Sequence, residues 1–153
     1  MMISSDDDVL RQLLGRDIAA DYEVVVRNPD NQPVVIRNAP FMRDGTPMPT
    51  LYWLVDPQLV REISQLESTG GVTTAQQMIA PADIAQTHER YAAERDATIP
   101  TNYEGPRPHG GVGGTRQGVK CLHAHYAYLL AGGDDPIGKW TGEQLEDLRE
   151  KNS

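Results

Sequence analysis

The chain has 153 residues, a net charge of -8 from 14 Lys+Arg and 22 Asp+Glu, and one cysteine. A length of this size predicts one domain over residues 1–153, whose core buries roughly two-thirds of the surface of the unfolded chain. Because Cys121 is alone, an intramolecular disulfide and a zinc finger with several thiolates are excluded. The acidic balance argues against nucleic-acid binding, no apolar run reaches the ~20 residues of a membrane span, and the acidic N-terminus does not resemble a signal peptide. We therefore expect a cytoplasmic protein.

The first third of the chain predicts one helix and three strands. A run of aspartates, Asp6–Asp8, begins a short amphipathic stretch that we expect to form a helix ending at Gly15. Two β-branched runs, Tyr22–Arg27 and Pro33–Arg37, flank a cluster of turn-forming residues and predict a hairpin. Thr50–Val55 is a candidate third strand.

The rest of the chain predicts helices interrupted by one long loop. Apolar residues recur at helical spacing in four segments, 57–67, 74–79, 81–99 and 119–131. Between Pro100 and Gly118, six glycines and several prolines predict a long loop, and the polar tail of about 141–151 predicts a surface helix. We expect an α+β fold, in which a small antiparallel sheet, made of the hairpin and the third strand, packs with several helices.

The densest concentration of reactive side chains directly follows this loop, in the segment Lys120–His125. If the segment is regular helix, Cys121 and His125 share a face and His123 points about 200° away from Cys121. If it is an irregular first turn, Cys121 and His123 converge instead. The positive end of a helix and the Lys120 ammonium would favour the thiolate, which suits metal binding or nucleophilic attack by Cys121 with His123 as base. The alternative is that Cys121 is a small buried apolar residue and the histidines bind backbone carbonyls.

A metal site at Cys121 and His123 for a divalent ion such as zinc needs further ligands from elsewhere in the chain. The available candidates are His88, Asp56, Asp30 and His109. The pair His88-Glu89 begins like the zinc motif H-E-x-x-H, but Ala92 stands where the second histidine belongs, so the motif fails.

The glycine-rich segment before Cys121 invites comparison with a phosphate-binding loop. The match fails because Val119 separates Gly118 from Lys120 and no clear strand precedes the segment. A weaker hypothesis is that Arg116 and Lys120, with backbone amides at the start of the next helix, bind a phosphate or carboxylate. The alternative is a flexible loop with two solvated cations.

Three segments resemble the bacterial domain-of-unknown-function 501 family: Asp44–Leu54, Thr87–Tyr91 and, most specifically, Gly118–Gly138. The resemblance extends from about Leu10 to Trp140 and implies no established activity. Members of the family often occur in gene neighbourhoods with septum-formation-initiator-like and exopolyphosphatase-like proteins. By association alone, this implies a protein partner in cell division or a role in phosphate metabolism.

The resemblance also bears on the metal hypothesis. In some relatives, cysteines stand where this chain has Asn28, Asp30 and Asp56, and these thiols with the Cys-Leu-His block imply a thiolate metal site in those relatives. In this chain the site is either lost or converted into a harder, oxygen-rich site around Cys121 and His123.

Two classes of function remain open from the sequence. The first is a metal-binding or thiolate site at Cys121 and His123, which would permit hydrolysis by metal-activated water or thiolate chemistry with histidine as base. The second is a non-catalytic interaction or regulatory protein that binds a partner through its acidic surface and aromatic patches.

Overall fold

The computed structural model describes residues 6–152, and within them a three-stranded antiparallel sheet combines with six α-helices. This confirms the α+β prediction. The strands are β1 (Ala20–Arg27), β2 (Pro33–Met42) and β3 (Tyr52–Leu54). The helices are α1 (Asp6–Leu14), α2 (Pro57–Ser68), α3 (Gly71–Met78), α4 (Pro81–Asp96), α5 (Leu122–Leu130) and α6 (Pro136–Asn152).

The sheet has the order β1-β2-β3, so the predicted hairpin and third strand are confirmed. The turn between β1 and β2 forms because the Asn28 side chain accepts hydrogen bonds from the backbone N–H groups of Asp30 and Gln32, at 2.9 and 3.0 Å. Asn31 adopts a φ of 65°, which asparagine tolerates better than most residues. The turn therefore forms through local side-chain chemistry that the sequence displays.

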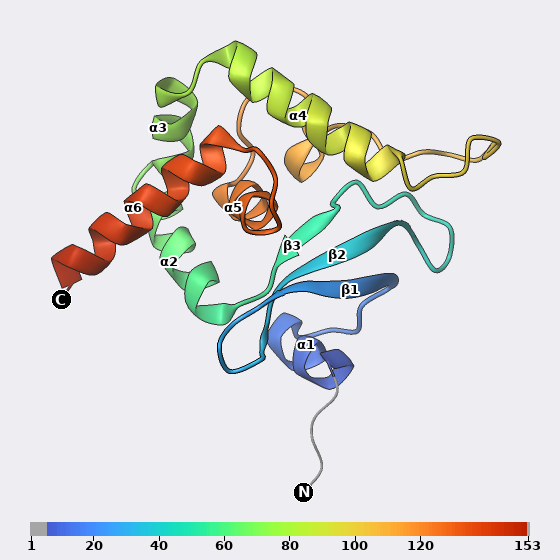
Figure 1. The fold of residues 1–153 in the computed structure, drawn as a ribbon, viewed down its shortest axis with the longest axis horizontal. Coiled ribbons are helices and arrows are strands. Elements are labelled where there is room, and N and C mark those ends of the chain that lie inside the picture. The colour runs from blue at the N-terminus through green and yellow to red at the C-terminus, as the bar shows by residue number, and fades with distance from the viewer. Residues whose placement is uncertain (1–5, 153) are drawn as a thin grey trace, which may run out of the picture.

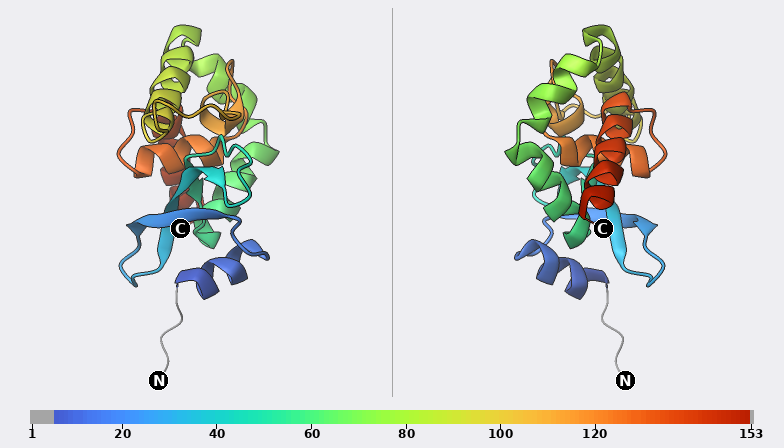
Figure 2. Two further views of the ribbon diagram at one scale, coloured as in Figure 1. Left: turned by 90° about the vertical axis from the view of Figure 1, so that its right-hand side faces the viewer. Right: turned by 90° about the vertical axis from the view of Figure 1, so that its left-hand side faces the viewer.

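Helices cover both faces of the sheet, but unequally (Figures 1 and 2). α1 covers one face, where Leu10, Ile36 and Val55 are buried together. The other face packs on the main core, to which β2, β3 and the helices from α2 to α6 contribute. Since each β-strand directs alternate side chains to opposite faces, Ile36 and Val35 belong to these two different cores.

Three helix starts differ from the predictions, and α4 ends at Asp96 rather than at 99. α3 begins at Gly71, three residues before the expected start at 74, because Gly70 at a φ of 89° turns the chain directly from one helix into the next. α5 begins at Leu122 rather than at 119, since Gly118 has a φ of 66° and Cys121 is extended. α6 begins at Pro136 rather than near 141. Among the helices of residues 6–152, none has the length and apolar character that crossing a bilayer requires.

The predicted long loop follows α4 and contains one short 3-10 turn, Val112–Gly114. Two side chains of α4 fasten it. Arg95 Nη1 donates to the carbonyl oxygen of Gly110 at 2.9 Å, and His88 bonds both the Val112 amide and the Gly118 carbonyl. The second half of the loop, residues 110–118, is therefore fixed to α4 before the chain reaches Cys121.

Candidate metal centre

Cys121 is the residue that immediately precedes α5, and its conformation decides which histidine it meets. Its backbone is extended, with a φ of -151° and a ψ of 149°, and its Sγ accepts a weak hydrogen bond from the Ala124 amide at 3.5 Å. Cys121 is thus the N-cap, and His123 lies in the first helical turn. The 200° separation expected within a regular helix does not apply, and Cys121 and His123 converge.

His125, the other histidine of this segment, has a different environment. Its Nδ1 donates to the Asp135 carboxylate at 2.7 Å, and both side chains are fully buried. The second Asp135 oxygen accepts from the Gly138 amide in the first turn of α6. This pair anchors α6 against α5 and has no part in the group formed by Cys121 and His123.

Glu67, at the end of α2, completes that group. One of its carboxylate oxygens accepts a hydrogen bond from the Leu122 amide at 2.8 Å, and the other lies 3.2 Å from His123 Nδ1. The carboxylate therefore accepts from one of the free N–H groups at the start of α5. It also lies at the positive end of the helix dipole, which is a favourable place for a negative charge. It also faces the histidine.

The His123 ring lies along one face of α2. Its Nε2 is 3.1 Å from the Val60 carbonyl oxygen and 3.3 Å from Ser64 Oγ. Since a carbonyl can only accept, Nε2 carries a hydrogen, and Nδ1 is the nitrogen that faces Glu67. A backbone carbonyl that fixes one nitrogen in this way is the usual support of a metal-bound histidine, because it leaves the lone pair of the other nitrogen available.

The charge state of His123 reflects the same neighbours. Burial favours the neutral ring, but the Cys121 side chain, the Val60 carbonyl and the Glu67 charge together outweigh it and raise the pKa of His123. A cation is therefore favoured between these groups. A metal ion bound at Nδ1 would take the place of a proton there.

The ligand atoms of Glu67, Cys121 and His123 all lie within 4.8 Å of one another, and all three residues are partly buried. One carboxylate oxygen, one sulfur and one imidazole nitrogen form a donor set that zinc accepts. The three residues fit a divalent ion and leave further coordination positions open.

The other residues that were predicted as metal ligands lie outside the group of Glu67, Cys121 and His123. His88 is buried, and both of its ring nitrogens are engaged: Nδ1 accepts from the Val112 amide at 3.1 Å, and Nε2 donates to the Gly118 carbonyl at 2.7 Å. Asp56 caps α2 by accepting from the Gln58 amide at 3.2 Å. Glu67 is eleven positions further along the helix, which is about 16 Å at 1.5 Å per residue. Asp30 is exposed in the turn between β1 and β2, and His109 lines a cavity beside α4.

Glu67 is the residue that the sequence analysis missed. On its own it resembles a solvated side chain on an amphipathic helix. One signal was present: a carboxylate in the last turn of a helix faces the negative end of that helix's dipole, which is unfavourable without a compensating partner. The partner is the start of α5, 55 residues further along the chain, and no spacing rule connects the two.

The chain was compared with known protein families, curated proteins and solved structures. The family described as "Protein of unknown function (DUF501)" matches residues 24–143, which includes all three residues of the metal group. The chain belongs to the DUF501 family. No curated protein and no solved structure matches it. The resemblance inferred from the sequence is thereby confirmed, and the family name carries no activity with it.

Proposed function

We propose that this DUF501 protein binds a divalent metal ion of the zinc type through Glu67, Cys121 and His123. The observation that carries the proposal is the convergence of the three ligand atoms within 4.8 Å, across the end of α2 and the start of α5. The orientation of His123 supports it, because Val60 holds Nε2 and leaves Nδ1 directed at Glu67. Zinc accepts sulfur, nitrogen and oxygen ligands together, which suits this donor set.

Three protein ligands correspond to a zinc site with an open position rather than to a closed structural site. When bound in such a site, zinc lowers the pKa of a water molecule to about 7 and so supplies hydroxide for hydrolysis. The chain's own part is to hold the three ligands and to leave access. Glu67 and His123 side chains are each 24% exposed, which leaves the site open to solvent.

Metal binding at this site must compete with a proton. The pKa of His123 is raised in the metal-free protein, against the effect of burial, by Cys121, Val60 and Glu67. A metal ion needs the deprotonated imidazole and the thiolate, so binding releases protons and weakens as the pH falls.

A second function uses the same residues without a metal. Cys121 lies beside His123 and favours the charged imidazole, and a cysteine next to a charged imidazole is the arrangement of a cysteine nucleophile. The two functions differ in how Cys121 reacts with an alkylating reagent. A metal-bound thiolate is protected until a chelator removes the ion, whereas a nucleophilic pair reacts equally with and without the chelator.

The direct test is the metal content of the full chain, purified without a histidine tag and supplied with zinc. We expect about one equivalent per chain in the wild type and loss of the ion in Cys121→Ser, His123→Asn and Glu67→Ala. Cobalt in place of zinc should produce an absorption band from sulfur-to-cobalt charge transfer, and this band should vanish in Cys121→Ser.

His109→Asn is the matched control for His123→Asn, since it makes the same change at an exposed histidine outside the group. It should retain the full metal content. Wild-type protein that holds substoichiometric zinc, with no further decrease in the three ligand variants, would contradict the proposal. Circular dichroism of each variant distinguishes a lost ligand from a lost fold.

A further inference from the structure

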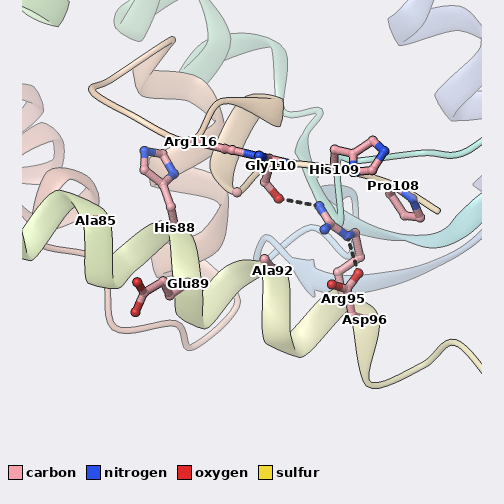
Figure 3. A pocket seen from close by; sticks show the side chains of 11 residues that line it. Ala85, His88, Glu89, Ala92, Arg95, Asp96, Pro108, His109, Gly110 and Arg116 are labelled. Carbon is pink, nitrogen blue, oxygen red and sulfur yellow. Dashed lines mark hydrogen bonds and ion pairs between the residues drawn. The ribbon is translucent and has the colours of Figure 1, made fainter. Parts of the chain in front are cut away.

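A cavity of about 410 Å³ lies between α4 and the glycine-rich loop, away from the metal group (Figure 3). α4 contributes the small side chains Ala85 and Ala92, which are two helical turns apart, and the loop contributes the backbone of Gly110 and Gly111. A second hollow of about 490 Å³ adjoins it and shares Ala85 and Arg116 with it. Small residues on one wall and bare backbone on the other leave room for a small molecule.

Arg95 is a buried cation in the wall of this cavity, with 1% of its surface exposed. Its Nη1 donates to the carbonyl oxygens of Pro49 and Gly110, at 3.1 and 2.9 Å, and its Nε donates to Asp96 at 3.0 Å. A guanidinium has five N–H donors, and no acceptor among residues 6–152 bonds Nη2. Nη2 is not one of the enclosed polar atoms that lack a partner, so its donors open onto the solvent of the cavity, where a ligand can reach them.

Arg116 is a second cation on the same cavity, and it comes from the loop. It is exposed and has no ion pair or hydrogen bond within the described part of the chain. Lys120, which the sequence analysis grouped with Arg116, does not line the cavity. Its side chain instead runs beside Gly113. Arg116 and Arg95, rather than Arg116 and Lys120, are therefore the basic residues that line this cavity.

The remaining charges of the cavity favour one group with a negative charge. Asp96 already pairs with Arg95 Nε, and His88 is held neutral because Nδ1 accepts from the Val112 amide. Glu89 is the other acidic lining residue, and Figure 3 draws its carboxylate on the side of α4 away from Gly110. Two guanidinium groups therefore face the space against one free carboxylate at its edge.

We propose that this cavity binds a small molecule through an oxyanion group, a carboxylate or a phosphate, held by Arg95 and Arg116. The planar guanidinium matches both groups because it can donate two parallel hydrogen bonds. The group would supply acceptors for Arg95 Nη2 and an ion pair for Arg116. Glu89 limits the total negative charge that the cavity accepts, which favours a ligand with a single oxyanion group.

The test is titration of the full chain with sodium phosphate and, separately, with sodium acetate, against sodium chloride at equal ionic strength, followed by calorimetry and thermal unfolding. We expect saturable binding of at least one of the two anions and a rise in Tm with its concentration. Binding of phosphate alone assigns a phosphate ligand, and binding of acetate alone assigns a carboxylate ligand. No saturable effect of either anion overturns the proposal.

Variants locate the site. Arg116→Gln should weaken anion binding roughly tenfold or more, since it removes a charge-assisted pair. Glu89→Gln should strengthen binding several-fold, because it removes the opposing charge. Lys120→Gln, the matched control, should leave binding unchanged. Equal affinity in Arg116→Gln and the wild type, or equal losses in Arg116→Gln and Lys120→Gln, would overturn the assignment to this cavity.

Arg95→Lys tests the buried partner while retaining its charge, and circular dichroism with a denaturant titration verifies that it folds. A folded Arg95→Lys protein that binds the anion as tightly as the wild type would contradict the role of Arg95. The proposal is independent of the metal site. His123→Asn should lose metal and still bind the anion, so failure of either proposal is distinguishable from failure of the other.

Discussion

His88 and His123 lie in two regions that look alike until the second nitrogen of each ring is considered. Both rings are largely buried, and the Nε2 of each donates to a backbone carbonyl, of Gly118 in one case and Val60 in the other. In His88, Nδ1 accepts from the Val112 amide and is already satisfied. In His123, Nδ1 faces the Glu67 carboxylate. The first histidine can only hold the loop to α4, whereas the second can exchange a proton for a metal ion.

The opposite directions of the pKa shifts follow from this difference. Burial lowers the pKa of His88, and the neighbouring His125 ring adds to that effect. The pKa of His123 is raised despite its burial, because Cys121, Val60 and Glu67 stabilise the charged ring. A buried histidine is therefore neutral or charged according to whether a donor or an acceptor faces its second nitrogen.

Removal of the imidazole ring should produce the largest difference in stability between the two regions. His88→Ala should reduce the free energy of unfolding by about 2–4 kcal/mol, since it leaves a buried amide without an acceptor and opens a cavity. His123→Ala should cost only about 1 kcal/mol, the value of one ordinary hydrogen bond at a partly exposed site. Metal content should change in the opposite sense, retained in His88→Ala and lost in His123→Ala.

Urea unfolding and metal analysis of the two variants provide both readouts. A large loss of stability in His123→Ala with little change in His88→Ala would reverse the assignment of structural and binding roles.

A second, smaller effect concerns how closely the loop approaches α4 at His88. A Cβ atom on Gly111 would lie 2.5 Å from the His88 Cβ and 2.6 Å from its Cα, closer than real atoms pack. Gly111→Ala should therefore displace the loop and cost about 1–3 kcal/mol, the usual range for overpacking. Gly45→Ala is a useful comparison, because Gly45 also sits in a loop but has open space around it.

The Gly45 variant carries the strain of a φ of 91°, whereas Gly111 has a φ of -105°, so a loss of stability in Gly111→Ala reports the close contact and not a positive φ. If Gly111→Ala unfolds at the same temperature as the wild type, close contact between the loop and α4 is not what requires a glycine at 111.

The free energy of unfolding should depend on pH through the titration of His88. Its folded-state pKa is lowered by burial, so the unfolded chain, with a histidine pKa of about 6.5, binds the proton more readily. The contribution of neutral His88 to stability is thus complete above about pH 6.5 and is lost as the pH falls toward its folded value. We expect a smaller decrease in the free energy of unfolding between pH 7 and pH 5 in His88→Ala than in the wild type, measured in urea. Parallel curves would mean that His88 does not titrate on unfolding.

The sequence was sufficient for the sheet and for the existence of each helix, because these depend on local patterns. The hairpin rests on two β-branched runs and on Asn28, whose side chain closes the turn by itself. The starts of α3, α5 and α6 were misplaced, since they depend on backbone conformations at Gly70, Gly118 and the residues around Asp135 that periodicity does not record.

Two of the three residues of the candidate metal site could be predicted from the sequence. Only Leu122 separates Cys121 from His123 in the chain, and convergence through an irregular first turn was one of two alternatives. The choice between them depended on Cys121 being the N-cap rather than a helical residue. The third member, Glu67, comes from a helix end that meets α5 only in three dimensions. The same holds for Arg95 and Arg116, which line one cavity only because the loop folds back over α4.

Glu67→Gln should have the smallest effect on stability of the variants that compare the regions around His88 and His123. It separates the two proposed roles of Glu67, which are capping α5 and binding a metal ion. The amide oxygen of glutamine can still accept from the Leu122 amide, as the carboxylate does at 2.8 Å, so the cap on α5 should survive with a change in stability within about 0.5 kcal/mol. The amide lacks the charge that a metal ligand and a histidine partner need. We therefore expect zinc affinity, measured by competition with a chelator, to fall at least about tenfold. Glu67→Ala should lose the cap as well as the metal and should unfold at a lower urea concentration.

Unchanged zinc affinity in Glu67→Gln would mean that Glu67 only caps α5. The region around His123 would then resemble that around His88, with a histidine whose neighbours are structural on both sides of the ring.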